Sequence, residues 1–533
     1  MRALTTKALS RWIVAGTLFI AGACAPISQA AVGSPDNNPA NSPDRVLAFG
    51  FEMIQDRYLT DVNIGNVAFE GLKGLSAIDP ALIFERPAPG RVLFRYRDDH
   101  VAEYPAPADS DPDGWASLIM AIARDAAAVS PELRKVDDEK IYEAVFDATL
   151  AKLDIFSRYA GAAEAREHRA FRNGFGGVGV RYQVEPQDIV LTEVMPETPA
   201  AEARLAVGDH VSAIDRTSLA GLSQNEISKR LRGPIDSAVA LTVSHGGNPQ
   251  SATVTLHRGL IVPPTVTMTT KDGIATIAIT GFNQNTAASA TEYLRQAEAM
   301  PNFKGVILDL RGNPGGLLDQ GVAVAGLFMT HGRIVSTRGR HPASLQVYDA
   351  APDAVAANVP LVVLVDGRSA SAAEIVTAAL QDSGRAVVVG TNSYGKGTVQ
   401  TVIRMPNDGE MTLTWSRFYS PSGYALHGLG VLPTICTADV HAQPAALLAP
   451  VRDGHSPVSA SIATWRASTI DETAERAQLR ASCPAAKQGD VALDGELARQ
   501  LILDHGLYVH ALSLTAPVST ASSASTALST SQH

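Results

Sequence analysis

The chain has 533 residues, which is too long for one hydrophobic core and indicates two to four domains. A composition of 45% hydrophobic and 18% charged residues is typical of a globular protein and excludes a largely disordered one. The chain carries 44 basic and 54 acidic residues, a net charge of −10, and no basic run, which excludes the electrostatic pattern of a nucleic-acid-binding protein.

The first 30 residues have the pattern of an export signal. A positively charged start precedes an apolar stretch at residues 12–22 that is too short to span a bilayer. Two ways of processing this signal are consistent with the sequence. One is ordinary cleavage after Ala30, and the other is lipidation of Cys24 in a segment that resembles a lipoprotein signal. No later segment is long and apolar enough to cross a membrane. We therefore expect an exported protein of the periplasm or cell envelope, with or without a lipid anchor at Cys24.

The three cysteines fit an oxidising compartment. If Cys24 is removed or lipidated, Cys436 and Cys483 are left as candidates for a disulfide. Two unpaired buried thiols are the alternative.

The N-terminal part of the mature chain reads as a spacer followed by helices. Residues 31–45, rich in Pro, Asn, Ser and Asp, indicate a flexible spacer. Residues 46–171 are predicted to be mainly helical, and the proline-rich stretch 105–112 is expected to separate two helical parts.

The rest of the chain divides into a β-rich module, an α/β core and two C-terminal segments. Residues 172–260 alternate like short strands and contain one clear helix. In residues 261–445, short β-branched runs alternate with helical segments, which suits buried strands covered by helices. Residues 446–512 form an extension with weaker signals, and the Ser/Thr/Ala-rich residues 513–533 are expected to be disordered. The strands predicted in the core are residues 274–279, 306–310, 361–365 and 386–389.

Three glycine- or serine-containing segments follow these core strands. Ser371 stands between a strand and a helix, where unpaired N–H groups can stabilise negative charge, although with Glu374 it also forms a capping box. Lys396 lies between two glycines, which would let other backbone approach and bury it. Burial would favour the neutral amine, which can act as a base. The alternative is a surface turn with an exposed lysine. Residues 308–316 end in Pro-Gly-Gly, which suits an oxyanion hole or a plain turn.

Other chemistries find no support in the sequence. Gly397 stands where a P-loop requires Ser or Thr, which excludes the nearest nucleotide-binding motif. The 13 histidines lie in no triad-like setting, and no Cys/His spacing resembles a metal site.

Together these segments resemble the C-terminal processing (tail-specific) peptidase family, from about residue 153 to residue 435. The motifs that carry the resemblance are Phe175-Gly176-Gly177-Val178-Gly179, residues 308–316, residues 369–375, residues 380–382, residues 395–401, Phe418-Tyr419-Ser420-Pro421-Ser422-Gly423 and residues 428–431. Family members usually carry Pro-His where this chain has Ile155-Phe156. Residues 46–140 and 446–533 match no part of the family.

The resemblance implies a multidomain α/β protein with an inserted PDZ domain and a protease core of the ClpP/crotonase type. Ser371 would be the nucleophile, Lys396 its general base and Gln400 the residue that orients the lysine. The backbone N–H of Ala372, with that of Gly315 or Gly316, would form the oxyanion hole. Ser369 and Asp382 also match family positions but are not expected to act directly.

The resemblance also implies a substrate class. The loop formed by Gly176, Gly177, Val178 and Gly179 would capture the terminal carboxylate of a protein or peptide substrate, which would pair as a strand beside residues 178–182. The expected activity is a serine endopeptidase that forms an acyl-enzyme and needs no metal or cofactor. The alternative is a catalytically silent, PDZ-containing envelope scaffold.

Overall fold

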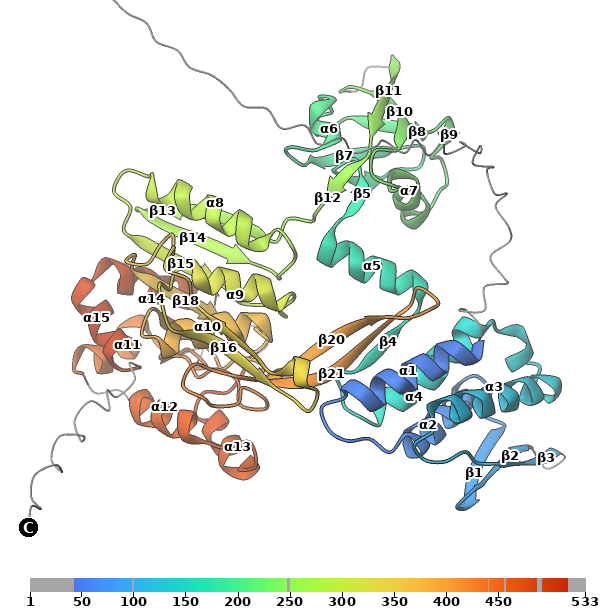
Figure 1. Cartoon of the computed structure of the whole chain (residues 1–533). Helices are drawn as coiled ribbons and strands as arrows, with labels where there is room; N and C mark the ends of the chain where they lie inside the picture. Colours follow the sequence, from blue (N-terminus) through green and yellow to red (C-terminus); the bar gives the residue numbers. More distant parts are fainter. Residues whose placement is uncertain are drawn as a thin grey trace, which may run out of the picture.

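The computed structural model describes residues 43–97, 100–246, 250–439, 441–454, 457–486 and 491–515. The chain forms a multidomain α/β protein, as predicted, with an N-terminal region, a β-rich module, an α/β core and a helical C-terminal extension (Figure 1). The predicted export signal, Cys24 and most of the spacer lie outside the described residues. The spacer prediction is wrong at its end, since the first helix begins at Pro43.

The N-terminal region combines helices with a small antiparallel sheet of order β1-β2-β3. Its elements are α1 (Pro43–Arg57), α2 (Ile64–Lys73), η3 (Gly74–Ala77), β1 (Leu82–Ala88), β2 (Arg91–Tyr96), β3 (His100–Pro105), α3 (Pro112–Val129), η4 (Leu133–Lys135) and α4 (Asp138–Ala151). The sequence analysis missed this sheet, so the proline-rich stretch follows a strand and does not separate two helical parts. The stacked rings of Phe84 and Phe94 show why these strands form, because alternate residues of β1 and β2 face the core.

The β-rich module contains a sheet of order β11-β10-β8-β7-β6, with β9 paired to β8. Its elements are β5 (Phe175–Gly177), β6 (Val180–Val184), β7 (Ile189–Val194), α6 (Pro199–Glu202), β8 (His210–Ile214), β9 (Thr217–Ser218), α7 (Gln224–Leu231), β10 (Ala238–Ser244), β11 (Ser251–His257) and β12 (Gly259–Ile261). Strand β6 lies at the edge of this sheet, and within the described part of the chain only β7 pairs with it.

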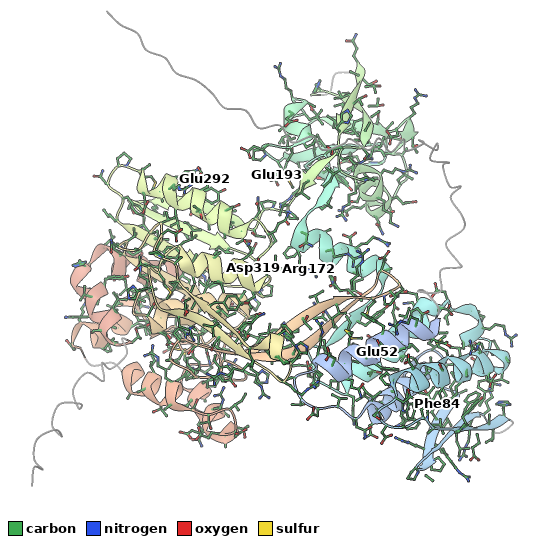
Figure 2. The ribbon with its side chains drawn as sticks, viewed as in Figure 1. Glu52, Phe84, Arg172, Glu193, Glu292 and Asp319 are labelled. Carbon is green, nitrogen blue, oxygen red and sulfur yellow. A yellow bond between two sulfur atoms is a disulfide. The ribbon has the colours of Figure 1, made fainter. Side chains whose placement is uncertain are left out.

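A helix and a two-stranded ribbon connect this module to the rest of the chain. Helix α5 (Ala162–Asn173) enters the module, and β5 pairs with β12 as the chain enters and leaves (Figure 1). Arg172, labelled in Figure 2, ties α5 to the neighbouring sheet through an ion pair with Glu410 of 2.6 Å.

The core is a six-stranded sheet of order β13-β14-β15-β18-β19-β22, in which only β13 is antiparallel to its neighbour. Its strands are β13 (Val266–Lys271), β14 (Ile274–Ile279), β15 (Gly305–Asp309), β18 (Leu361–Val365), β19 (Val387–Gly390) and β22 (Ile435–Cys436), and its helices are α8 (Thr286–Glu298), α9 (Leu318–Gly326) and α10 (Ala372–Asp382). The four predicted strands are confirmed as β14, β15, β18 and β19, each within one residue. Their apolar side chains are buried on both faces, as such runs require.

A second sheet joins the core to the N-terminal region. It has the order β17-β16-β21-β20, with β4 paired to β21. Its elements are β4 (Arg158–Ala160), β16 (Arg333–Arg338), η5 (Pro342–Ser344), β17 (Gln346–Asp349), β20 (Thr398–Arg404) and β21 (Glu410–Tyr419). The hairpin of β20 and β21 reaches α1 and α4, and its residues Ile403, Met411 and Leu413 are part of the N-terminal hydrophobic core (Figure 1).

The C-terminal extension packs against the core sheet. Its helices are α11 (Pro444–Arg452), α12 (Pro457–Ala467), α13 (Thr473–Ala481), α14 (Val491–Leu503) and α15 (His505–Ser513). Leu497, Leu501 and Tyr508 cover the apolar face of β18 and β19. The predicted disordered tail is wrong for residues 513–515, since Ser513 ends α15 and Thr515 is buried, and residues 516–533 lie outside the described residues. Among the helices that the structure describes, none has the length and apolar character needed to span a bilayer.

Candidate active site

Three adjacent parallel strands bring the predicted site segments to one edge of the core sheet. The order β15-β18-β19 places their carboxyl ends side by side. We name the segments that follow these strands the glycine turn (residues 312–316), the serine turn (residues 366–371) and the lysine loop (residues 391–397). Carboxyl ends of parallel strands are the usual place for a site in an α/β sheet.

The serine turn holds Ser371 in a strained conformation. Its φ is +56°, in a region that L residues rarely adopt, and α10 begins at the next residue. Strain of this kind between a strand and a helix presents a side chain at the apex of the turn. Ser369, in contrast, is fully buried and its hydroxyl donates to Leu310 O at 2.8 Å, which makes it a structural residue of the turn.

The glycine turn packs directly against Ser371. The N–H of Gly312 donates to Asp366 Oδ1 at 2.9 Å, and the N–H of Ala370 donates to Asn313 O at 2.9 Å. A β-carbon on Gly315 would lie 2.7 Å from Ser371 Cβ, closer than atoms can approach, so glycine is required there. The two segments are therefore fixed relative to each other by hydrogen bonds and by close packing.

The choice between the two oxyanion candidates in the glycine turn is narrowed by one hydrogen bond. The N–H of Gly315 already donates to Asn313 Oδ1 at 2.8 Å. Gly316 is therefore the better partner for Ala372, whose N–H stands at the start of α10. The oxyanion roles of these residues stay a prediction.

Glu374 joins the serine turn to the lysine loop. Its Oε2 accepts from the N–H of Ser371 at 2.8 Å and from the N–H of Lys396 at 2.9 Å. Its Oε1 accepts from the hydroxyl of Ser393 at 2.5 Å and from the N–H of Gly395 at 2.6 Å. Burial raises the pKa of the Glu374 carboxyl above its usual range, and the four donors oppose that effect. The capping-box pattern predicted the first bond, but the other three link segments far apart in sequence.

Lys396 is half-buried, as expected from its flanking glycines. A β-carbon on Gly397 would lie 1.8 Å from the backbone nitrogen of His427, so only glycine lets these two segments pack. Burial, and then the positive charge of Arg158, lower the pKa of the Lys396 ammonium below its ordinary value. Its Nζ lies 5.2 Å from the centre of the Phe156 ring. The lysine environment therefore favours the neutral amine that a base requires.

Phe156 and His427 belong to a cavity beside the lysine loop that sequence reasoning did not identify. The cavity has a volume of about 490 Å³. Residues that line it include Tyr58, Phe156, Gly395, Arg417 and His427. Phe156 is one of the two residues at which the chain departs from the usual Pro-His of the family. That departure was the only sequence signal for this wall of the site.

Among the described residues, no hydrogen bond joins Gln400 to Lys396. Strand β20 has a bulge between Val399 and Gln400, and a bulge interrupts the alternation of side chains along a strand. The Gln400 amide donates to Thr398 Oγ1 at 2.9 Å and to Thr414 Oγ1 at 3.3 Å. Its role in orienting Lys396 stays a prediction.

The predicted carboxylate loop lines a groove of the β-rich module. Gly179 has a φ of +84°, and a β-carbon there would lie 2.3 Å from Thr198 Cβ, so the loop requires glycine at this position. Its neighbours Gly176 and Gly177 belong to β5, and Val178 is buried. A cavity of about 110 Å³ lies between β6 and α7. Residues that line it include Gly177, Val178, Gly179, Tyr182, Ser228 and Leu231.

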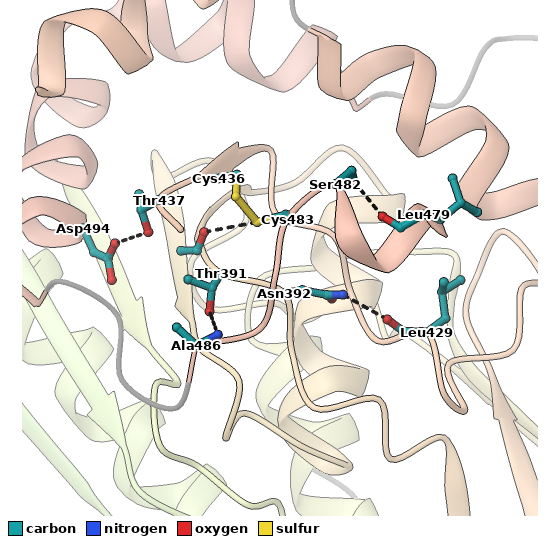
Figure 3. Close-up of a disulfide and its surroundings, with 11 residues drawn as sticks. Thr391, Asn392, Leu429, Cys436, Thr437, Leu479, Ser482, Cys483, Ala486 and Asp494 are labelled. Carbon is teal, nitrogen blue, oxygen red and sulfur yellow. Dashed lines mark hydrogen bonds between the residues drawn. A yellow bond between two sulfur atoms is a disulfide. The ribbon is translucent and has the colours of Figure 1, made fainter. Parts of the chain in front are cut away.

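The two remaining cysteines form a disulfide, which overrides the alternative of two unpaired thiols. Cys436 is the last residue of β22, and Cys483 lies shortly after the end of α13. Their Cα atoms are 5.9 Å apart (Figure 3). The bond ties the C-terminal extension to the core beside the lysine loop. Within the described ranges, no group of three or more His, Cys, Asp or Glu side chains is arranged to hold a metal ion.

Comparisons with known proteins show what this chain is similar to. The model of peptidase family S41 matches residues 273–437, and a PDZ-domain model matches residues 176–256. The chain is 36% identical over 303 residues to a carboxy-terminal-processing protease of Bartonella bacilliformis, covering 56% of this chain and 70% of that protein. It is 30% identical over 304 residues to a probable CtpA-like serine protease of Staphylococcus haemolyticus, covering 56% of this chain and 60% of that protein. Among solved structures, the photosystem II D1 C-terminal processing protease is similar at 22% identity and a TM-score of 0.36, over 74% of this chain and 92% of that one.

Proposed function

Because this chain belongs to peptidase family S41 and is a C-terminal processing serine protease with a PDZ domain, we propose that Ser371 and Lys396 are its catalytic dyad. One observation carries this proposal. The backbone N–H groups of both residues donate to the same oxygen, Oε2 of Glu374, so the two nitrogens lie within about 6 Å of each other. Residues that are 25 positions apart are thereby held on either side of one buried carboxylate.

The chemistry is acyl transfer through an ester on Ser371. Neutral Lys396 accepts the proton of the Ser371 hydroxyl as Oγ bonds to the carbonyl carbon of the scissile peptide. The N–H groups of Ala372 and Gly316 stabilise the oxyanion. The lysine then gives the proton to the leaving amine as the C–N bond breaks. Water attacks the ester with Lys396 again as base, and the acid product leaves as Ser371 regains its proton.

Proton transfer requires the amine of Lys396 to lie within hydrogen-bond reach of the Ser371 hydroxyl. Nζ of Lys396 lies by the Phe156 ring and has no hydrogen-bond partner among the described residues. We propose that rotation about the side-chain bonds of Lys396 sets this contact, while the hydrogen bond to Glu374 holds the lysine backbone in place.

Substrates are proteins selected by their C-terminal tails. The free side of β6 accepts a tail as an added strand, and the loop of Gly176, Gly177, Val178 and Gly179 receives its carboxylate. Main-chain hydrogen bonds supply affinity that tolerates many sequences, while an apolar last side chain enters the groove between β6 and α7. We infer that the enzyme cleaves such proteins as an endopeptidase.

A Ser371→Ala variant tests the nucleophile. Hydrolysis of an unstructured peptide with an apolar C-terminus, and labelling by a fluorophosphonate probe, are both expected to disappear while the protein stays folded. The matched control is Ser383→Ala at the other end of α10, which should retain both. Hydrolysis that persists in Ser371→Ala would refute the assignment. Tail binding without probe labelling of the unmodified protein would support the silent scaffold instead.

We also propose that the protein is exported to the periplasm or cell envelope. The signal-like first 30 residues support this, and so does the disulfide, which is typical of oxidising compartments. The mass of the mature N-terminus distinguishes cleavage after Ala30 from a lipidated Cys24. An unprocessed N-terminus in expressing cells would contradict export.

A further inference from the structure

The lysine loop is held on two sides, and Glu374 occupies only one of them. That carboxylate accepts hydrogen bonds from the N–H groups of Gly395 and Lys396, and carbonyl groups of the loop have other partners. Arg480, in the last turn of α13, donates to Ser393 O at 2.9 Å and to Tyr394 O at 2.9 Å. It also donates to Leu429 O at 2.7 Å, in the segment beside the loop. One guanidinium therefore binds three carbonyl oxygens, two of them in the lysine loop just before Gly395.

A second arginine on the same face of α13 holds the other wall of the site. Arg476 lies one turn before Arg480, so the two side chains point in the same direction. It is buried and donates to Ala425 O and His427 O, both at 2.7 Å. The backbone at His427 is the one against which Gly397 packs. Arg480 therefore holds the lysine loop itself before Lys396. Arg476 holds the segment against which the loop packs after Lys396.

The disulfide fixes the position of these arginines. Cys483 lies three residues after Arg480, and its bond to Cys436 fastens the end of α13 to β22 (Figure 3). The next residues continue along the site: the N–H of Ala486 donates to Thr391 Oγ1 at 3.2 Å, and the N–H of Gly367 donates to Ala486 O at 2.7 Å. The segment 476–486 thus contacts both the lysine loop and the serine turn.

We propose that Arg480 is a positioning residue for peptide hydrolysis, and that the Cys436–Cys483 disulfide keeps it in place so that the base is set correctly only in the oxidised protein. The inference rests on the proposed role of Lys396. It gives the C-terminal extension, which lies beyond the residues that the family model matches, a function in the active site. An arginine suits this task because its planar group can reach three carbonyl oxygens at once, which a lysine ammonium cannot do in the same geometry.

A purely structural role and a positioning role give different results. If Arg480 only stabilises the fold, its loss lowers the melting temperature and leaves the kinetics of the folded enzyme unchanged. If it positions the loop, its loss lets water reach Lys396, which raises the pKa of the ammonium. The base then becomes neutral only at higher pH, so the acidic limb of the kcat/KM profile moves to higher pH.

The first experiment compares Arg480→Ala, Arg480→Lys and the control Arg499→Ala in the full-length oxidised protein. Arg499 lies in the same extension and pairs with Asp272, away from the site. We expect Arg480→Ala to lose about 10²-fold in kcat with little change in KM, and its acidic limb to move to higher pH. Arg480→Lys should recover only part of both, because it keeps the charge and loses the fork. Arg499→Ala should match the unmodified enzyme.

An unchanged kcat and acidic limb in Arg480→Ala would overturn the positioning role, as would an equal change in Arg499→Ala. If Arg480→Ala fails to fold, Arg480→Lys decides: full activity with an unmoved limb refutes the proposal. Failure of the dyad itself is separate, since it would appear as activity in Ser371→Ala.

The second experiment tests the disulfide. Dithiothreitol should lower kcat of the unmodified enzyme and move its acidic limb in the direction seen for Arg480→Ala. The double variant Cys436→Ser/Cys483→Ser should show the same kinetics and no response to dithiothreitol. If mass spectrometry confirms two free thiols while kcat and the limb are unchanged, the disulfide has no part in setting the base.

Discussion

The serine turn and the lysine loop hold their catalytic groups in different ways. The serine turn connects β18 to α10 and packs against the glycine turn, with Ser371 in a strained conformation. The lysine loop leaves the sheet after β19, and besides its backbone hydrogen bonds it is held by two polar side chains from other segments, Glu374 and Arg480. The nucleophile is thus held between a strand and a helix of the core, whereas the base lies in a loop that side chains from other segments also hold.

This difference indicates where activity can be adjusted. Moving Ser371 requires the core sheet to distort, which close packing resists. Moving Lys396 breaks hydrogen bonds and packing contacts of one loop and leaves the core sheet in place. Substitutions around the lysine should therefore change kinetics with small effects on stability, and substitutions around the serine should change both.

The largest loss of activity is expected for Lys396→Met. The same substitution should leave the stability of the fold unchanged or raise it. Without the base, kcat should fall by at least about 10⁴-fold. Burial lowers the folded-state pKa of Lys396, so the unfolded chain binds more protons between that lowered value and the ordinary 10.5. The free energy of unfolding therefore rises with pH in this window, and below it the buried charge destabilises the fold.

Lys396→Met removes this cost, so its free energy of unfolding at neutral pH should equal or exceed that of the unmodified protein. Urea denaturation at several pH values measures it, with Lys304→Met as the exposed control. A clear loss of stability would mean that the ammonium is satisfied in the fold, contrary to its proposed use as a neutral base.

Glu374→Gln should impair both segments at once. A glutamine keeps the size but presents an NH₂ group to at least one backbone N–H that the carboxylate now accepts. An unsatisfied buried donor costs about 1–3 kcal/mol, and displacement of the dyad should lower kcat by about 10³-fold. Thermal melting and steady-state kinetics measure the two effects. If both stay unchanged, Glu374 does not hold the segments together. Glu298→Gln, at the end of α8, is the control.

Gly315→Ala should have the next largest effect, on the serine side. The new β-carbon meets Ser371 Cβ at 2.7 Å, and the φ of +102° is strained for alanine. We expect about 1–3 kcal/mol of destabilisation and about a 10²-fold loss of kcat. Gly326→Ala is the control, because a β-carbon there meets no atom within 4 Å. A stable and fully active Gly315→Ala would show that the serine turn yields easily, against the contrast drawn above.

Sequence alone predicted the parts of the molecule that depend on local patterns. The runs of β-branched residues located β14, β15, β18 and β19, and the motifs after them located Ser371, Lys396 and the glycine turn. The β1–β3 sheet was missed because its alternation is short and interrupted by Arg and Glu residues, so that only the stacking of Phe84 on Phe94 makes it evident.

The contacts that assemble the site were beyond such patterns because they join distant segments. The capping box indicated a bond between Ser371 and Glu374 but not the three other donors to that carboxylate. Nothing near Arg480 in sequence indicates that it binds carbonyl groups of residues 393 and 394. The family departure at Phe156 was visible, yet its position beside Lys396 follows only from the fold.

The smallest expected effect belongs to Phe156, which borders the lysine without holding its backbone. Phe156→Ala removes a ring that shields Lys396 from water, so the pKa of the ammonium should rise and the acidic limb of the kcat/KM profile should move to higher pH. At pH values above the acidic limbs of both the variant and the unmodified enzyme, their kcat values should differ by no more than about threefold. The reason is that Glu374 and Arg480 still hold the lysine loop in the variant. Phe156→Leu, which is apolar and of similar bulk, is the control and should move the limb less. A limb that moves to lower pH in Phe156→Ala would mean that the ring stabilises the charged ammonium more than it excludes water, and the base would then owe its neutral form to other neighbours.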